Sequence, residues 1–264
     1  MEDKLEASFE DFKSTENRNI RAINKAYEIE IDIFKRYFNI QNKLFVNHVG
    51  GLLDPYYGIE DYERILLQAF TKTNHLLYAS LNLTNSGNYG ASSILLRQIF
   101  EFQILGKYAY TIKDEKMSQK WLDGKQFDIY DKVIKLLDKP SKVNFHTFWL
   151  MLCKLSHATT SSHQIEFKAP KNADQIHASL IIILMLQRCN YHLLTSCFIT
   201  KKLTYRSEYY LNLKKENSAL KNEARLIKKE ISNLLSSDGK KLIKDYESTW
   251  NFKTRTTPNN VLAQ

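Results

Sequence analysis

SGNYGASSILLRQIFE, residues 86–101, is the stretch that decides the fold class of this 264-residue chain. Its glycines and asparagine indicate a turn between two helices. From Ala91 onward, apolar residues recur at steps of three and four, which is the period of an α-helix. Arg97 and Glu101 lie four residues apart inside this apolar pattern, so they share a helix face and can pair. The pattern predicts an interior helix that holds a partly buried ion pair, because charges are seldom buried alone.

Composition favours an all-α protein. The chain has only 4 prolines and 8 glycines, and 43% of its residues are hydrophobic, which suffices for a sizeable core. We expect a helical bundle over residues 1–204, a basic, coiled-coil-like helical arm over 205–250 and a frayed tail over 251–264. Helices are expected at about 2–48 (one or two), 60–83, 86–111, around Trp121, and at 128–137, 144–157, 177–201 and 209–234. Asp174 is expected to cap the helix at 177–201.

The chain shows no feature of a secreted, membrane or metal protein. Its first ten residues are acidic and lack an apolar core, and its longest uncharged apolar stretch, within 175–187, is shorter than the roughly 20 residues that span a bilayer. Cys153, Cys189 and Cys197 are odd in number and lie in apolar surroundings. We therefore expect a cytoplasmic protein with reduced thiols and without a metal or cofactor.

The net charge of +9 is concentrated near the carboxyl end. Residues 201–264 hold 14 Lys and Arg against 7 Asp and Glu, whereas the first 200 residues hold 24 against 22. The basic residues of the arm are interspersed with Glu216, Glu223 and Glu230. They form either a solvated helix face or a surface for phosphate. The candidates for nucleic-acid binding are Lys214, Lys215, Lys221, Arg225, Lys228 and Lys229.

The same arm carries a heptad-like seam. Apolar residues and one asparagine step by four and three, which is the spacing of a coiled coil, and a single seam asparagine can set register and partner number. Such a seam predicts a homo-oligomer, and a dimer in the simplest case. Packing of the seam onto the chain's own body is the alternative, because three heptads are marginal alone. The seam residues are Leu213, Asn217, Leu220, Ala224, Ile227, Ile231 and Leu234.

Histidines near arginines are the best candidates for chemistry. His157 follows a strongly apolar helix and, with Arg97 and Glu101, forms the first candidate catalytic set. A histidine can move a proton near neutral pH and an arginine can hold a phosphate, which suits RNA cleavage. Arg188 and His192, four apart on one helix, form the second candidate. The alternative is that both sets are structural. Phosphate-binding glycine loops, zinc patterns and nucleophile elbows are absent from the sequence.

Part of the chain resembles a known group of proteins. Residues 87–91 (GNYGA), 95–101 (LLRQIFE) and 154–157 (KLSH) are similar to bacterial all-helical proteins akin to the HEPN superfamily, over about a third of the chain. The resemblance implies an α-helical bundle, often dimeric, associated with phage defence or RNA cleavage. Active HEPN nucleases have an arginine and a histidine with four to six residues between them. This chain departs from that spacing, since only three residues separate Arg188 from His192 and Arg97 is far from His157.

Two functional hypotheses follow. The first is a bacterial phage-defence protein that binds RNA, with metal-independent endonucleolytic cleavage as an added activity. In it, Arg97 contacts phosphate, Glu101 orients the arginine and His157 shuttles protons. The second is a non-enzymatic assembly or sensor subunit that contacts another defence protein, with Arg97 and Glu101 as a structural pair.

Overall fold

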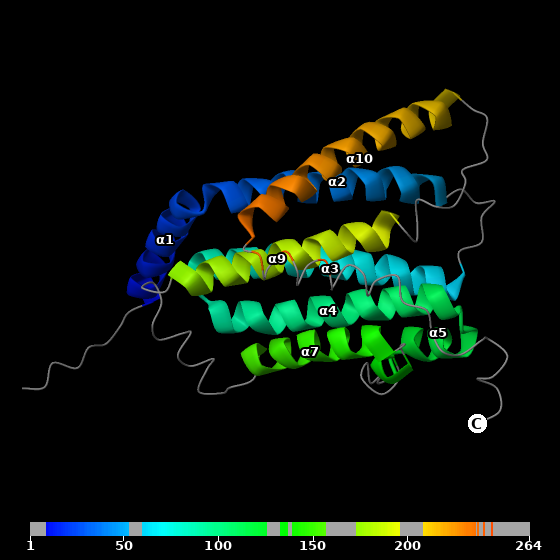
Figure 1. Cartoon of the computed structure of the whole chain (residues 1–264), viewed down its shortest axis with the longest axis horizontal. Helices are drawn as coiled ribbons and strands as arrows, with labels where there is room; N and C mark the ends of the chain where they lie inside the picture. The colour runs from blue at the N-terminus through cyan, green and yellow to red at the C-terminus, as the bar shows by residue number, and fades with distance from the viewer. Residues whose placement is uncertain are drawn as a thin grey trace, which may run out of the picture.

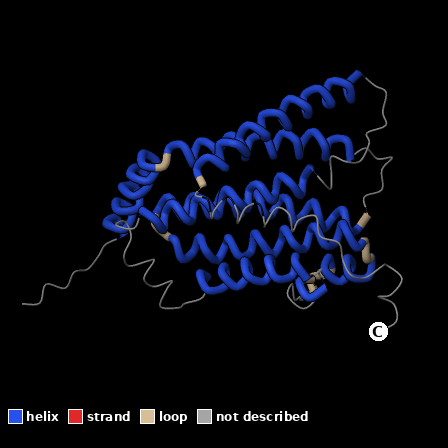
Figure 2. Tube along the Cα trace, in the orientation of Figure 1, coloured by secondary structure: helices blue, strands red, loops and turns tan. Residues whose placement is uncertain are grey.

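The structure is a computed structural model, and it describes residues 9–52, 60–125, 133–136, 139–156, 173–195 and 208–235, with single positions at 237, 240 and 244. Within those ranges every regular element is a helix, which confirms the all-α prediction (Figure 2). None of the helices in the described part of the chain has the length and hydropathy needed to cross a membrane. The tail predicted at 251–264 and His157 lie outside the described residues.

The long helices lie side by side, with α1 bent away at one end (Figure 1). The region before residue 53 forms two helices, and α9 begins upstream of its expected start, so that Asp174 lies in its first turn instead of capping it. Of the expected helix at 128–137, only residues 133–136 are described, and they contain a short 3₁₀ turn, η1. The elements are α1 (Phe9–Ala26), α2 (Glu28–Leu52), α3 (Asp61–Ser86), α4 (Tyr89–Ile112), α5 (Glu115–Leu122), η1 (Ile134–Leu136), α7 (Lys139–Ser156), α9 (Ala173–Leu193) and α10 (Glu208–Leu234).

A tight reversal joins α3 to α4 at the predicted turn. Gly87 has a φ of 90°, a left-handed conformation that glycine adopts without strain. The N–H of Asn88 donates to the carbonyl of Leu83 at 2.8 Å, and the N–H of Gly87 donates to that of Thr84 at 3.1 Å. These two bonds form a Schellman cap. Asn19 of α1 donates to the carbonyl of Ser86 at 3.3 Å, so the turn also anchors α1.

Helices α4 and α9 are the two interior helices that their apolar sequences predict. Gly106 of α4 lies so close to α3 that a Cβ there would stand 2.8 Å from the Cβ of Ala69. Gln187 and Asn190 of α9 are fully buried, although both are polar. Their side chains bond to neighbouring helices, and Gln187 Nε2 donates to the carbonyl of Phe34 in α2 at 3.0 Å.

Helix α10, which holds the predicted seam, packs on α2 and α9 of the same chain. The side chains of Ala224, Ile227 and Ile231 are fully buried there. Asn217 accepts a hydrogen bond from Asn47 Nδ2 of α2 at 3.1 Å. In the structure, the seam therefore packs on the body of its own chain, which is the alternative to a coiled coil. Self-association of the chain stays a prediction.

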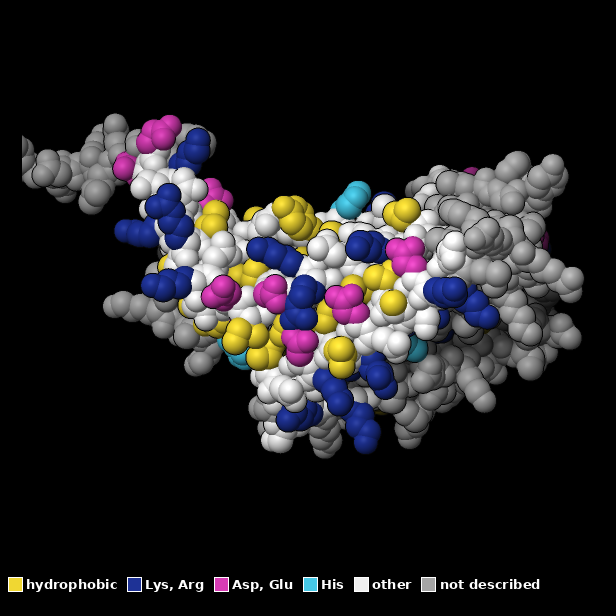
Figure 3. Space-filling model, turned by 90° about the horizontal axis from the view of Figure 1, so that it is seen from above, with side chains coloured by type: hydrophobic (Ala, Val, Ile, Leu, Met, Phe, Trp, Pro, Cys, Tyr) yellow, Lys and Arg dark blue, Asp and Glu magenta, His cyan; other side chains and the backbone are white. Residues whose placement is uncertain are grey.

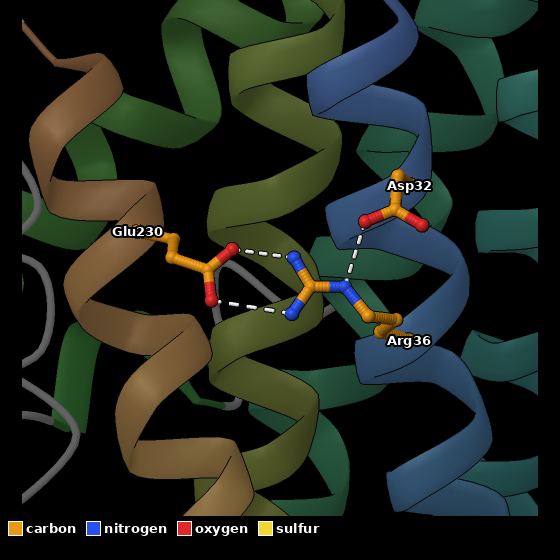
Figure 4. A network of polar contacts seen from close by, with 3 residues as sticks. All are labelled: Asp32, Arg36 and Glu230. Atoms are coloured by element: carbon orange, nitrogen blue, oxygen red, sulfur yellow. Dashed lines mark hydrogen bonds and ion pairs between the residues drawn. The ribbon is translucent and has the colours of Figure 1, made fainter.

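An ion pair fastens α10 to α2 (Figure 4). The Arg36 guanidinium makes a two-pronged contact with Glu230, with Nη1 donating to Oε1 at 3.2 Å and Nη2 donating to Oε2. Its Nε donates to Asp32 within α2 at 2.7 Å. The paired carboxylates raise the pKa of Arg36 above its usual value, against a lowering by partial burial. Arg36 stays charged and links α2 to α10 at a partly exposed position.

We expect Ile227→Ala to lower the free energy of unfolding by about 2–4 kcal/mol, because it removes a fully buried side chain between α10 and the bundle. Urea titration followed by circular dichroism measures the loss. Leu226→Ala is the matched control, since Leu226 is exposed and its removal should cost less than about 0.5 kcal/mol.

The same titration distinguishes packing within the chain from a coiled-coil dimer. Packing within one chain predicts an unfolding midpoint that does not change with protein concentration, whereas a dimeric seam predicts a midpoint that rises with it. A rising midpoint that Ile227→Ala abolishes would contradict the arrangement described above.

Candidate functional site

Arg97 and Glu101 form the predicted ion pair, and a tryptophan completes it. Arg97 Nε lies 2.9 Å from Glu101 Oε1, and Trp149 Nε1 of α7 donates to the same oxygen at 3.1 Å. The Arg97 guanidinium carbon lies 5.6 Å from the centre of the Trp149 ring, within range of a cation–π contact. The two charged side chains are 29% and 27% exposed, so the cluster is half-buried at the surface where α4 meets α7.

Helix α7 runs antiparallel to α4 beside this cluster. Phe100 of α4 contacts Phe145 and Phe148, with ring centres 5.8 Å and 5.1 Å apart. Cys153 lies further along α7, where the charges of Arg97 and Glu101 act on its thiol. Burial raises the pKa of its thiol, while Arg97 lowers it and Glu101 raises it by smaller amounts. Cys153 is therefore a protonated core thiol and not a nucleophile.

Sequence reasoning missed two members of this cluster. Trp149 is the partner that binds Glu101 and faces Arg97, and His146 stacks on its ring with centres 6.3 Å apart. The contact between His146 and Trp149 could be predicted, since they lie three residues apart and share a face of α7, but that spacing does not indicate Glu101 as the partner of Trp149. His157, the third member of the predicted catalytic set, follows Ser156, the last residue of α7, and lies outside the described residues.

The second predicted pair lies elsewhere, where α9 meets α10. Arg188 is 6% exposed and its Nη1 donates to Ser232 Oγ of α10 at 3.4 Å. His192 follows one turn later on α9. Beside them, Lys228 Nζ of α10 lies 5.1 Å from the centre of the Tyr191 ring. Arg188 is thus part of the α9–α10 packing, whereas Arg97 is part of the α4–α7 packing.

The basic residues of α10 form an outward face. Lys214, Lys221 and Arg225 are exposed, as are Lys215 and Lys229, while Lys228 is half-buried against Tyr191. At about 100° per residue, these six residues occupy an arc of about 140° on the helix. The buried seam occupies a separate arc, so docking of the seam turns the basic arc toward solvent.

The acidic residues of α10 occupy a different stripe. Glu216, Glu223 and Glu230 recur at seven-residue steps, which keeps them within an arc of about 40° beside the seam. Glu230 in that stripe faces α2, where it binds Arg36. Figure 3 views the side of the molecule that carries α2 and α10, and a group of Lys and Arg side chains gathers at its lower edge. The charges that look mixed in the sequence are therefore separated on the folded helix.

No group of three or more histidine, cysteine or carboxylate side chains is placed to hold a metal ion among the residues that the structure describes. Comparison with known proteins finds no family model, no curated protein and no solved structure that matches the chain.

We expect Arg97→Ala to lower the free energy of unfolding by about 1 kcal/mol, because the pair it breaks is partly exposed and screened by water. A fully buried pair would cost about 3–5 kcal/mol. Arg64→Ala is the matched control, since its contact with Asp61 is longer, at 3.8 Å, and Arg64 is more exposed. Chemical denaturation measures both variants, and a loss above about 3 kcal/mol for Arg97→Ala would show that Glu101 is left effectively desolvated.

Proposed function

We propose that this protein binds RNA through the outward basic face of α10, defined by Lys214, Lys215, Lys221, Arg225 and Lys229. The observation that carries the proposal is the separation of charge on a docked helix. One stripe of α10 is buried, an acidic stripe lies beside it, and the basic residues face solvent.

The geometry suits a phosphate backbone. From Lys214 to Lys229 the face extends about 22 Å along the helix, at about 1.5 Å per residue. Cations held along such a length release counterions when they neutralise several phosphates, and this release drives non-specific binding. Residues 201–264 hold 14 Lys and Arg against 7 Asp and Glu, whereas the first 200 residues are nearly balanced. The attraction for a polyanion is therefore concentrated in the carboxyl-terminal part of the chain, which includes α10.

Charge alone favours nucleic acid in general, and the resemblance to HEPN proteins supports RNA as the ligand. The same resemblance supports a role in bacterial phage defence, in the cytoplasm, with a second copy of the chain or another defence protein as partner. The assembly hypothesis, in which the protein acts only through such protein contacts, predicts no affinity for RNA.

Replacing Lys214, Lys221, Arg225 and Lys229 together by alanine is expected to weaken RNA binding at least about tenfold at 0.1 M salt. The slope of log affinity against log salt should fall by about 3, since each single-strand phosphate contact contributes about 0.7. Fluorescence anisotropy with a labelled single-stranded RNA measures both quantities, and a duplex DNA of equal length tests the preference for RNA.

The matched control replaces four exposed cations of α1 by alanine. That variant has the same net charge as the α10 variant, so an equal loss of affinity in both would refute a dedicated face on α10. Intact affinity in the α10 variant would refute it as well. The control positions are Lys13, Arg18, Arg21 and Lys25.

RNA cleavage is the second candidate function, and the half-buried Arg97 cluster favours it. Arg97 keeps 29% of its side chain exposed and contacts α7, whose last residue directly precedes His157 in sequence. In this proposal Arg97 holds a phosphate, Glu101 and Trp149 orient the guanidinium, and His157 transfers the proton.

If the protein cleaves RNA, His157→Ala should lower the cleavage rate by about 100-fold or more, because general acid–base catalysis contributes about 10²–10⁴. Cleavage should persist in EDTA, since the proposed step uses no metal. Gel analysis of labelled RNA measures the rate, with His163→Ala as the control and anisotropy to confirm unchanged binding. Equal rates for wild type and His157→Ala would remove the catalytic role.

A further inference from the structure

A groove of about 510 Å³ lies between α2 and α3, on the flank of α2 that faces away from α10. The α2 residues that line it are separated from Arg36 and Asn47, which contact α10, by about half a turn of the helix. Its volume lies within the range of about 300–1,000 Å³ that is usual for sites of small ligands. The main lining residues are Phe38, Asn42 and Phe45 of α2 and Phe70, Asn74 and Tyr78 of α3.

The walls of the groove are aromatic. The Phe45 and Phe70 rings stack with centres 4.6 Å apart, and the Phe38 and Tyr78 rings lie 6.2 Å apart at an angle of 37°. Tyr78 is 56% exposed, an unusual exposure for a large ring that packs on another ring. Its ring is therefore available for stacking by a further planar group.

The groove also contains a directed chain of amides. Asn190 Nδ2 of α9 donates to Asn74 Oδ1 at 2.7 Å, and Asn74 Nδ2 donates to Asn42 Oδ1 at 2.8 Å. Asn74 is 4% exposed, and Asn42 is half-buried in the groove. Asn42 lines the groove, and an amide whose oxygen accepts one hydrogen bond still has two N–H donors and a second lone pair to offer. A paired donor and acceptor of this kind matches the edge of a nucleobase.

One lysine lies on the same side of α2 as the groove. The sequence has no Asp or Glu from residue 35 to 52 of α2 or from residue 64 to 86 of α3, whereas both stretches contain lysines. Lys35 precedes Phe38 by three residues and therefore lies on the same side of α2. Lys35 also lines a separate pocket with Glu28 and Asp32, and Asp32 is paired with Arg36. An anion at this end of the groove would therefore meet Lys35 within a mixed set of charges.

We propose that the α2–α3 groove binds the base of a nucleotide. Tyr78 and Phe38 stack on the base, Asn42 bonds to its edge, and Lys35 attracts its phosphate. The ligand is either one base of an RNA strand or a free nucleotide, since both present this chemistry. The proposal goes beyond RNA binding by α10, because the groove lies on one flank of α2 and α10, which carries the basic face, packs on the other.

A purely apolar occupant fits less well. Covering the groove with an aliphatic or phenyl group would shield the Asn42 amide from water without replacing its hydrogen bonds, which is unfavourable. The base of a nucleotide both stacks and bonds at its edge, so it satisfies the rings and the amide together.

The test measures binding of the four ribonucleoside monophosphates by equilibrium dialysis and of an eight-nucleotide RNA by anisotropy. Tyr78→Ala should weaken the binding of whichever ligand binds, mononucleotide or octamer, by at least about fivefold. Tyr78→Phe keeps the ring and should leave that affinity unchanged. Asn42→Ala should reduce the differences in affinity among the four bases. Both positions are partly exposed, and circular dichroism confirms that the variants fold.

Each outcome of these binding measurements either supports or overturns nucleotide binding by the groove. Mononucleotide binding that Tyr78→Ala weakens supports the groove with a free nucleotide as ligand, and an effect confined to the octamer supports it with a base of RNA. No binding in either arm, binding that neither Tyr78→Ala nor Asn42→Ala changes, or equal binding of N-acetyl-tryptophanamide overturns the proposal. The α10 alanine variant should keep its mononucleotide affinity, so failure of the groove and failure of the α10 face give different results.

Discussion

Buried side-chain amides set the register of this bundle. Gln41 Nε2 donates to the carbonyl of Gln187 at 3.0 Å, and Gln187 Nε2 donates to that of Phe34 at 3.0 Å, so α2 and α9 are joined in both directions. Gln103 of α4 donates to the carbonyl of Leu186 at 2.7 Å. A buried amide that loses its partner costs about 1–3 kcal/mol, so sliding of any of these helices would be penalised at several places together. Apolar packing alone tolerates more alternatives.

The proposed binding surfaces depend on that register. Helix α10 lies on both α2 and α9, so the pairing of Gln41 with Gln187 determines the platform on which its seam rests. Asn190 extends the same amide network to Asn74, one of the residues that line the α2–α3 groove. The groove and the α10 platform are therefore positioned by one set of buried contacts, although they face different sides of α2.

The sequence predicts what local spacing determines. The Arg97–Glu101 pair, the turn at Gly87 and the two interior helices follow from contacts within a few residues. The amide network could not be predicted, because its partners lie 146 residues apart for Gln41 and Gln187 and 116 apart for Asn190 and Asn74. Glutamine and asparagine in a helical pattern indicate a buried network only when the neighbouring helices are known.

The partner of the α10 seam could not be predicted from the sequence either. Its spacing describes a stripe that can pack on a second copy or on α2, and the sequence does not distinguish the two. The mixed charges of α10 were equally ambiguous, since their separation into faces matters only when the buried side is known. Trp149 was missed because its bond to Glu101 joins two residues that lie 48 positions apart in sequence, on different helices.

Packing of the seam within the chain also bears on which surfaces are free to bind. If α10 left the body to form a coiled coil, Leu220, Ile227 and Ile231 would lose their present burial. Each buried aliphatic side chain of this size is worth about 1.5–3 kcal/mol, and a second copy would have to restore that while also losing translational freedom. The bundle presents α2 to the seam at a high effective concentration, which favours the contact within the chain. The outward basic face needs no such rearrangement, so it can contact a polyanion while the bundle stays intact.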